Sequence, residues 1–394
     1  MTYSYSRSTY SDLAGGNTAV HAQIGDQEFL NAIVEFERAL ATAAHSSGII
    51  SDDEHTAAIA AIDGYEVDVE EISQLSAGGA NPAIPISKQL KKRAGEVGAK
   101  GIHTGATSQD AIDTALVLVL KRGTNELLDL AAHVIKRLAE FTETYADAPV
   151  MGRTLGQAAQ PMTFGLVAAN WLETIDDACV DLERACDSLP VQYGGATGTL
   201  SATYPSGLEI HNKLARVLEL ESAPRIWHTN RVPLVRFATS VAIVAGTIRK
   251  VAGDIIFMSA SEVGELQEAT PGGSSSMPHK ANPAAAVAAD GYARRASGLA
   301  NTMLESLDSR LQRGVGSWHA EWATLRELLA VTASATSRLW ASIDGINVNT
   351  AAMEKNMIDT GTVGHAAEIV TDIINRAEMT RRPHRDEACP NCAT

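Results

Sequence analysis

One long apolar stripe limits what this chain can fold into more than any other feature. Over residues 112–145, apolar side chains recur at every third or fourth position, and Gly123 is the one weak point in the pattern. About 35 residues of unbroken helix extend over roughly 50 Å. Helices of that length are rare in compact domains and usual in long bundles. The stripe therefore predicts a bundle of long helices.

Later segments of comparable length show the same helical periodicity. They cover residues 162–189, 234–265, 284–307 and 322–343. Aromatic residues make up only 5% of the chain while alanine is plentiful, which favours helix over strand. We therefore predict an all-α fold with a central bundle of five long helices. The expected boundaries are 1–105 for an N-terminal helical domain, 106–345 for the bundle and 346–394 for a short C-terminal domain and tail.

Charge and hydropathy limit the partners of the chain. A formal net charge of -15 argues against nucleic acid and against an anionic membrane surface. No apolar run approaches the length that spans a bilayer, and residues 1–12 do not resemble a secretory signal. We expect a cytoplasmic protein that binds neither nucleic acid nor membrane. An anionic small molecule remains a suitable substrate, because a local cluster of donors can oppose the overall charge.

The cysteines do not predict a metal centre. Cys179 and Cys186 share one face of a predicted helix and are expected to be buried thiols. Cys389 and Cys392 form a Cys-Pro-Asn-Cys tail near His384, which lacks the second half of a zinc site. We expect this tail to be disordered, with a metal or redox role as the alternative. No metal and no cofactor are expected.

Polar loops separate the apolar helices at residues 101–110, 149–161 and 272–283. The third loop contains two glycines, three consecutive serines and two prolines, so it cannot continue a helix. Its hydroxyls, His279, Lys280 and an amide are a dense set of donors for a carboxylate. A plain linker between helices would explain the serines but not the rest of the loop.

A helix of this length cannot bring its own two ends together. Loops at distant sequence positions can therefore meet only if they come from suitable ends of different helices or from different subunits. This geometry suggests an oligomer with composite sites.

The third loop resembles the signature loop of the fumarase/aspartase superfamily. It reads Gly273-Ser274-Ser275-Ser276-Met277-Pro278-His279-Lys280-Ala281-Asn282-Pro283. Residues 103–110 and 152–157 resemble the other two signature regions of that superfamily, and the resemblance covers about residues 1–375. It implies a homotetramer with a twenty-helix core, in which each active site takes its three regions from three subunits. It also implies that a base removes the proton next to a carboxylate, so that an enediolate forms.

The resemblance assigns roles within the third loop. Ser274 is the expected base, with Ser275 and Ser276 as the alternatives. A serine hydroxyl must be activated by a closed site that is rich in donors. Lys280 is expected to stabilise both an alkoxide at Ser274 and the enediolate of the substrate. Asn282 and Ser275 are expected to bind the substrate.

The first region offers three candidate residues. Thr107 and Ser108 present hydroxyls that suit a substrate carboxylate. A hydroxyl pair before a helix is also an ordinary N-cap, and Asp110 can share that task. The presence of the other two regions favours substrate contact. His103 is a catalytic candidate, either as a proton shuttle or as a hydrogen-bond donor to the substrate.

The second region departs from a common superfamily pattern at Leu155, where many members have a histidine that serves in acid–base work. The departure counts against a lyase that must protonate a nitrogen leaving group. It is compatible with a carboxylate that adds or leaves, because a carboxylate needs no proton. Gln157 remains as an expected substrate contact.

Residues 105–114 and 317–322 resemble the bacterial 3-carboxy-cis,cis-muconate cycloisomerase branch. This resemblance implies that a small tricarboxylate substrate closes, without a metal, to 4-carboxymuconolactone, in protocatechuate breakdown by the β-ketoadipate route. It makes His319 a substrate contact. Alternatively, Trp318 and Trp322 are core residues, and His319 and Glu321 form a polar pair. Members of this branch usually have a longer C-terminal domain.

Two other functions remain open. An adenylosuccinate-lyase-like enzyme that releases fumarate is disfavoured by Leu155 and by the Trp-His-Ala-Glu-Trp sequence of residues 318–322. A non-catalytic helical scaffold of the same superfamily is disfavoured by the presence of Ser274, Lys280 and Asn282.

Overall fold

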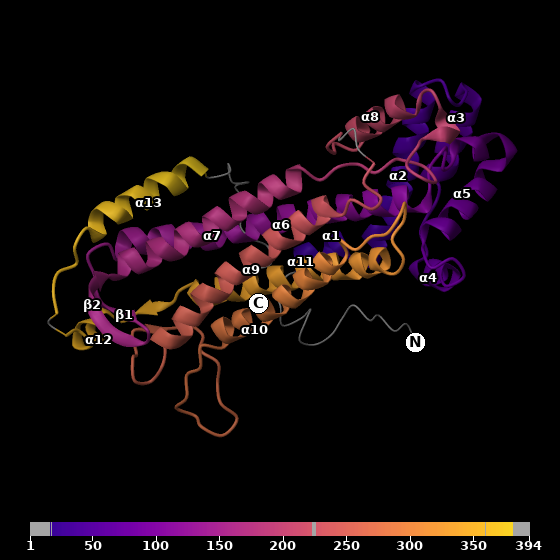
Figure 1. Ribbon diagram of the computed structural model, residues 1–394. Helices are drawn as coiled ribbons and strands as arrows, with labels where there is room; N and C mark the ends of the chain where they lie inside the picture. The colour runs from indigo at the N-terminus through magenta and orange to yellow at the C-terminus, as the bar shows by residue number, and fades with distance from the viewer. Residues whose placement is uncertain (1–15, 17, 223–225, 359, 381–394) are drawn as a thin grey trace.

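The computed structural model describes residue 16 and residues 18–222, 226–358 and 360–380, and five long helices run alongside one another through it (Figure 1). They are α6 (Ser108–Thr144), α7 (Phe164–Asp187), α9 (Val232–Met258), α10 (Ala284–Glu305) and α11 (Ser317–Ile343). The longest, α6, has 37 residues and extends over about 55 Å. The predicted all-α fold with a five-helix bundle is confirmed.

Helix α6 continues through Gly123 because its neighbours pack closely at that position. A Cβ on Gly123 would lie 2.6 Å from Cγ2 of Ile24, at the end of α1 (Thr18–Ile24), and 2.8 Å from Cδ2 of Leu329 on α11. Glycine costs about 1 kcal/mol relative to alanine inside a helix. Close packing of three helices offsets this cost.

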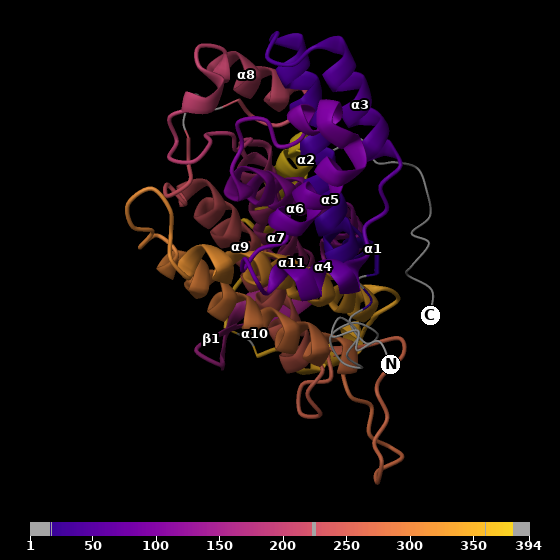
Figure 2. The same cartoon turned by 90° about the vertical axis from the view of Figure 1, so that its right-hand side faces the viewer.

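Shorter helices gather around the N-terminal end of α6 (Figure 2). They are α2 (Asp26–Ser46), α3 (Asp52–Asp63), α4 (Val69–Ser76), α5 (Ala83–Gly98), α8 (Gly207–Val217) and the 3-10 turns η2 (Ala99–Gly101) and η3 (Ser201–Thr203). Helix α2 packs against α3, α6 and α8 and so forms the centre of this group. It thereby places its buried face beside the loop that leads into α6.

The opposite end of the bundle carries a hairpin and two short helices (Figure 1). The hairpin pairs β1 (Pro149–Thr154) with β2 (Gln157–Thr163) in antiparallel register, and β3 (Leu266–Gln267) pairs with β4 (Asn347–Val348) nearby. Helix α12 (Thr350–Lys355) packs against β1, and α13 (Ala366–Thr380) packs against α7.

The prediction of a loop over residues 149–161 is therefore wrong. Leu155 and Gly156 have φ angles of 53° and 77°, and this pair of positive values makes a two-residue turn between the strands. Such turns match the twist of a hairpin. The turn was not predicted from the sequence, because leucine rarely adopts a positive φ.

Two helix ends also differ from the predictions. Helix α9 ends at Met258 because a turn through Gly264 (φ 63°) brings the N–H of Glu265 back to the Met258 carbonyl at 2.9 Å. Helix α11 begins at Ser317 and not at Trp322, so the Trp-His-Ala-Glu-Trp sequence lies in its first turns.

The two cysteines of α7, Cys179 and Cys186, are buried as predicted. Cys389 and Cys392 lie outside the described residues. Among the described helices, none combines the length and the apolar character required to cross a membrane.

Candidate active site

The three polar regions lie at two opposite ends of the bundle (Figure 1). Helix α6 separates the ends by about 55 Å. The end where α6 begins, here called the first end, holds His103, Thr107, Ser108 and His319. The second end holds Gln157, Ser274, Ser275, Lys280 and Asn282. One copy of the chain thus does not bring the predicted site residues together.

His103 at the first end is held by a buried carboxylate on α2. Its ring Nδ1 lies 2.6 Å from Oε1 of Glu37, and its backbone N–H donates to Oε2 at 2.7 Å. His103 adopts a φ of 59° in this contact. Burial opposes protonation of the imidazole, but the charges of Glu37 and Asp110 prevail and raise the pKa of His103 above its usual 6.5. The geometry and the charge both favour a protonated ring.

Asp110 fixes the start of α6. Its carboxylate accepts hydrogen bonds from the backbone N–H groups of Thr107, Gly194 and Gly195, each at 2.9 Å. His228 lies 2.7 Å from the same carboxylate. Asp110 therefore shares the N-capping of α6 with Thr107, as expected from the sequence. The same carboxylate also holds residues 194–195 against the first signature region.

A buried charged cluster lies beneath this region. Arg231 contacts Asp113 at 2.8 Å and Glu321 at 3.0 Å, and all three side chains are buried. Trp318 donates its indole N–H to Asp113 at 2.8 Å. The alternative prediction that Glu321 pairs with His319 is wrong, because Arg231 takes this carboxylate.

His319 is exposed on the first turn of α11. Its ring centroid lies 4.9 Å from those of Trp318 and Trp322. Trp318 is buried, whereas Trp322 is only partly buried. His319 is thus placed at the first end, on an aromatic surface that holds its ring beside the start of α6.

The third region forms a protruding loop at the second end, and its hydrogen bonds are mostly internal. The hydroxyl of Ser274 accepts from the N–H of Met277 at 3.1 Å and of Ser276 at 3.4 Å. The amide of Asn282 donates to the carbonyls of Gly272 and Gly273, each at 3.1 Å. Asn282 therefore closes the loop on itself.

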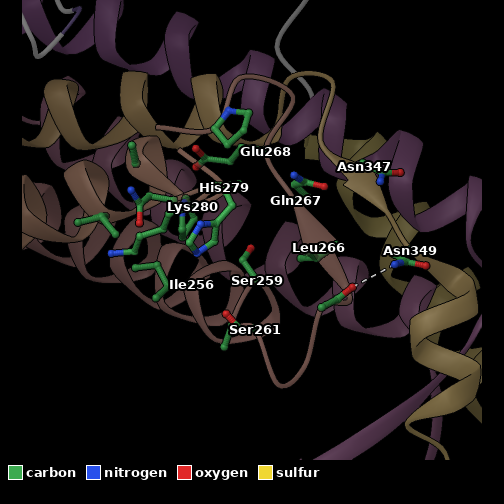
Figure 3. Close-up of a pocket in the computed structure, with 18 of the residues that line it drawn as sticks. Ile256, Ser259, Ser261, Leu266, Gln267, Glu268, His279, Lys280, Asn347 and Asn349 are labelled. Carbon is green, nitrogen blue, oxygen red and sulfur yellow. Dashed lines mark hydrogen bonds between the residues drawn. The ribbon is translucent and has the colours of Figure 1, made fainter. Parts of the chain in front are cut away.

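A cavity of about 920 Å³ lies between this loop and the end of the bundle (Figure 3). Its polar lining includes His279, Lys280, Ser259, Gln267 and Asn349. The exposed side chain of Lys280 reaches this lining, whereas Ser274 and Ser275 do not belong to it.

Buried Glu268 fixes the base of the loop. Its carboxylate accepts from the N–H groups of Ala285 at 3.2 Å and Ala286 at 2.9 Å. A carboxylate at this position satisfies free N–H groups and complements the positive end of the α10 dipole. The loop therefore rises from a firmly held base.

The second region is anchored at the base of its hairpin and exposed at its tip. Arg153 makes two contacts with Glu265, at 2.9 and 2.6 Å, and the amide of Asn356 donates to the same carboxylate at 2.8 Å. Arg153 thus joins the hairpin to the segment that leads into the third region. Leu155 at the tip has an exposed fraction of 102%, and Gln157 beside it is also exposed.

Sequence reasoning missed the carboxylates that hold these regions. Glu37 could have been recognised from the sequence, because it lies on the apolar face of α2 between the buried Ile33 and Leu40. A carboxylate at such a position requires a buried partner. Glu265 and Arg231 left no comparable signal, since their partners are far away in sequence. Among the described residues, no cluster of His, Cys, Asp and Glu is arranged to hold a metal ion.

Comparison with known proteins decides the family. A lyase family model matches residues 5–298. The chain belongs to this lyase family. The predicted membership of the fumarase/aspartase superfamily is confirmed, and the chain is an enzyme of this group.

Relatives with established names refine the comparison. The chain is 34% identical to the 3-carboxy-cis,cis-muconate cycloisomerase of Bradyrhizobium diazoefficiens, over 94% of this chain and 84% of that protein. It is also 34% identical to the enzyme of that name from Pseudomonas aeruginosa, over 94% of this chain and 82% of that protein. The crystal structure of 3-carboxy-cis,cis-muconate lactonizing enzyme from Pseudomonas putida superposes with a TM-score of 0.81 at 31% identity, covering 94% of this chain and 89% of that one.

Proposed function

We propose that this enzyme is a 3-carboxy-cis,cis-muconate cycloisomerase, which closes a small tricarboxylate to 4-carboxymuconolactone without a metal, in the β-ketoadipate breakdown of protocatechuate. Relatives of that name support the substrate. The observation that carries the proposal is the joint presence of Ser274 and Lys280 on one loop and of Leu155 at the hairpin tip. The loop supplies a hydroxyl and a cation, and the tip supplies no acid for a leaving group.

The reaction forms one C–O bond and one C–H bond, consumes one C=C π bond and takes up one proton. A carboxylate oxygen of the substrate adds across a double bond of the diene. The carbon next to a second carboxylate then receives a proton from Ser274, which regains a proton from solvent before the next turnover. In reverse, Ser274 removes this proton. Lys280 stabilises the intervening enediolate, whose negative charge develops on the carboxylate oxygens.

Hydrogen bonds at Ser274 favour it over its neighbours as the proton donor. Two backbone N–H groups point at its hydroxyl oxygen, those of Met277 and Ser276. Hydrogen bonds to the deprotonated form of a group stabilise that form. An alkoxide at Ser274 therefore has two donors in place before Lys280 contributes. Ser275 and Asn282 remain the proposed substrate contacts on this loop, with Thr107, Ser108 and His319 from the first end.

The active site is proposed to be shared within a homotetramer, with its three regions supplied by three subunits. The separation of the two ends by about 55 Å supports this arrangement. The outward surfaces of two bundle helices also support it, because they combine exposed apolar side chains with glycines that face open space. These residues are Ile243, Phe257, Val287, Leu304, Gly246, Gly253 and Gly298.

In this proposal Glu37 of the N-terminal domain (1–105) positions His103 and the bundle of 106–345 builds the tetramer core. Helix α12 of the C-terminal domain (346–394) supports the hairpin. The enzyme is proposed to act in the cytoplasm on a small molecule and not on nucleic acid.

An ultraviolet assay tests the proposed function. Purified enzyme is mixed with 3-carboxy-cis,cis-muconate in the presence of a chelator, and the conjugated-diene absorbance is followed. The proposal predicts that this absorbance is lost in the wild type and retained in the Ser274→Ala variant. An unchanged absorbance with wild-type enzyme, together with release of fumarate from adenylosuccinate, would replace the proposal with the lyase alternative.

A further inference from the structure

Glu37 is a buried carboxylate whose two oxygens serve a single residue. Oε1 contacts the His103 ring and Oε2 accepts from the His103 backbone N–H. The side chain of Glu37 is 1% exposed. Burial of a carboxylate is unfavourable unless partners satisfy it. The buried face of α2 therefore holds a carboxylate whose hydrogen bonds among the described residues all orient His103.

A two-point contact determines which edge of the imidazole faces outward. A carboxylate only accepts hydrogen bonds, so the Nδ1 of His103 carries a proton towards Glu37. The opposite edge carries Nε2. Within the described part of the chain nothing bonds to Nε2, and the ring side chain keeps 14% of its surface accessible.

Charged groups reach His103 from three helices. Glu37 approaches from α2 and Asp110 from α6, and both favour the imidazolium form. Lys91 approaches from α5 and opposes it, as does burial. Two of these three charged side chains are carboxylates, so the surroundings of the ring favour the imidazolium form.

We propose that Glu37 is a positioning residue that holds His103 with its Nε2–H outward, as a charged donor to one carboxylate of the substrate. This inference rests on the proposed function for the identity of the substrate. Of the two roles predicted for His103, this proposal assigns that of hydrogen-bond donor, because a protonated ring whose Nδ1 faces Glu37 presents Nε2–H on its opposite edge.

The charge of such a donor matters because the substrate carries three carboxylates. A hydrogen bond between an imidazolium and a carboxylate is roughly twice as strong as a neutral one. His103 lies on the loop that ends at Thr107, just before Ser108 begins α6, and the hydroxyls of these two residues suit the same kind of group. The first end then acts as a carboxylate-binding surface, and the second end supplies the proton.

The test compares Glu37→Gln with Glu35→Gln. Glu35 lies on the same helix and pairs with Arg122 at 2.7 Å, away from His103, so it controls for the loss of a carboxylate from α2. The imidazole resonance of His103 is titrated by NMR in each protein, without substrate. We expect Glu37→Gln to lower the pKa of His103 by about one unit or more, since a contacting opposite charge shifts a pKa by about one to three units. The control leaves this pKa unchanged.

Kinetics supply the second readout. With 3-carboxy-cis,cis-muconate as substrate, Glu37→Gln is expected to raise KM about tenfold with a smaller change in kcat, because a binding contact is weakened. His103→Asn keeps a residue that tolerates the positive φ. The double variant of Glu37→Gln and His103→Asn is expected to be no worse than His103→Asn alone.

Three results would overturn the inference. The first is an unchanged pKa of His103 in Glu37→Gln. The second is a loss confined to kcat, and the third is a double variant whose defects add. If the wild type leaves the muconate unchanged, the proposed function fails, but the NMR titration still decides whether Glu37 holds His103.

Discussion

The two ends of the bundle hold their polar side chains in different ways. At the first end, buried carboxylates are matched by partners from distant parts of the chain, as Asp110 is by His228 and Glu37 by His103. At the second end, Ser274 bonds within its own loop and Lys280 is exposed. The polar groups of the first end are thus held by distant segments, whereas the proposed reacting groups of the second end lie on a loop whose hydrogen bonds are mostly internal.

This difference suits a division of labour in catalysis. Segments with few buried contacts open at low free-energy cost, and loops that close over a substrate are drawn from them. Precise placement of a substrate instead requires side chains that are locked by their surroundings. The proposed binding groups and the proposed reacting groups lie at opposite ends of one copy of the chain, and this separation is why we propose a site shared between subunits.

The largest expected effect is the loss of activity without loss of stability at the second end. Ser274→Ala is expected to lower kcat by about 10³-fold, the middle of the range for a general acid or base. The melting temperature is expected to stay unchanged, because this hydroxyl bonds only within its loop. Steady-state kinetics and thermal unfolding measure both values. Ser276→Ala is the control, and an equal loss in that variant would contradict the assignment of Ser274.

Loss of stability is expected instead at the first end. Arg231→Met leaves the carboxylates of Asp113 and Glu321 buried without their cation. The free energy of unfolding is expected to fall by about 3 to 5 kcal/mol, as for other broken buried pairs. Denaturant titration measures the change. Arg295→Met, which removes an exposed partner of Glu327, is the control and is expected to change little. An equal loss of stability in Arg231→Met and Arg295→Met would show that the buried cluster of the first end contributes no more to stability than an exposed ion pair.

The hairpin tip should separate stability from activity. Leu155→Asn relieves a positive φ that costs leucine about 1 kcal/mol. We expect stability to be kept or slightly raised. We also propose that the exposed Leu155 makes an apolar contact in the site of a neighbouring subunit, so that its loss lowers kcat/KM about tenfold. Leu311→Asn is a matched control, since Leu311 is also exposed and has a φ of 55°. A Leu155→Asn variant with full activity would show that the tip has no role in catalysis.

The smallest expected effect is a pH dependence of stability at the first end. The pKa of His103 is raised above 6.5, so the folded state binds this proton more tightly than the unfolded state. The stabilisation is fully present below pH 6.5 and is lost as pH rises through the folded pKa. Denaturant titrations at several pH values measure the free energy of unfolding of the wild type and of Glu37→Gln. We expect the difference between the two proteins to shrink as pH rises, and a difference that grew with pH would contradict the raised pKa of His103.

The sequence predicted features that are written in local patterns. The long helix α6 and the polar third loop were both predicted correctly, because helical periodicity and loop composition depend on residues that are neighbours in the sequence. The β1–β2 hairpin was missed because Leu155 takes a backbone conformation that its side chain disfavours. The contacts of His103 with Glu37 and of Arg153 with Glu265 join residues far apart in sequence, so only the folded chain shows them.

Mixing two variants with defects at opposite ends tests the proposed shared active site most directly. One variant carries Ser274→Ala, and the other carries Thr107→Val and His103→Asn, so the defects lie at opposite ends. The two are expressed together and the mixed oligomers are assayed. If sites combine different subunits at random, about one quarter of them receive both intact ends, and activity returns to about a quarter of the wild-type value. Ser274→Ala mixed with Lys280→Met, both on one loop, should recover nothing. Failure of the first pair to exceed the separate variants would contradict a site built between subunits.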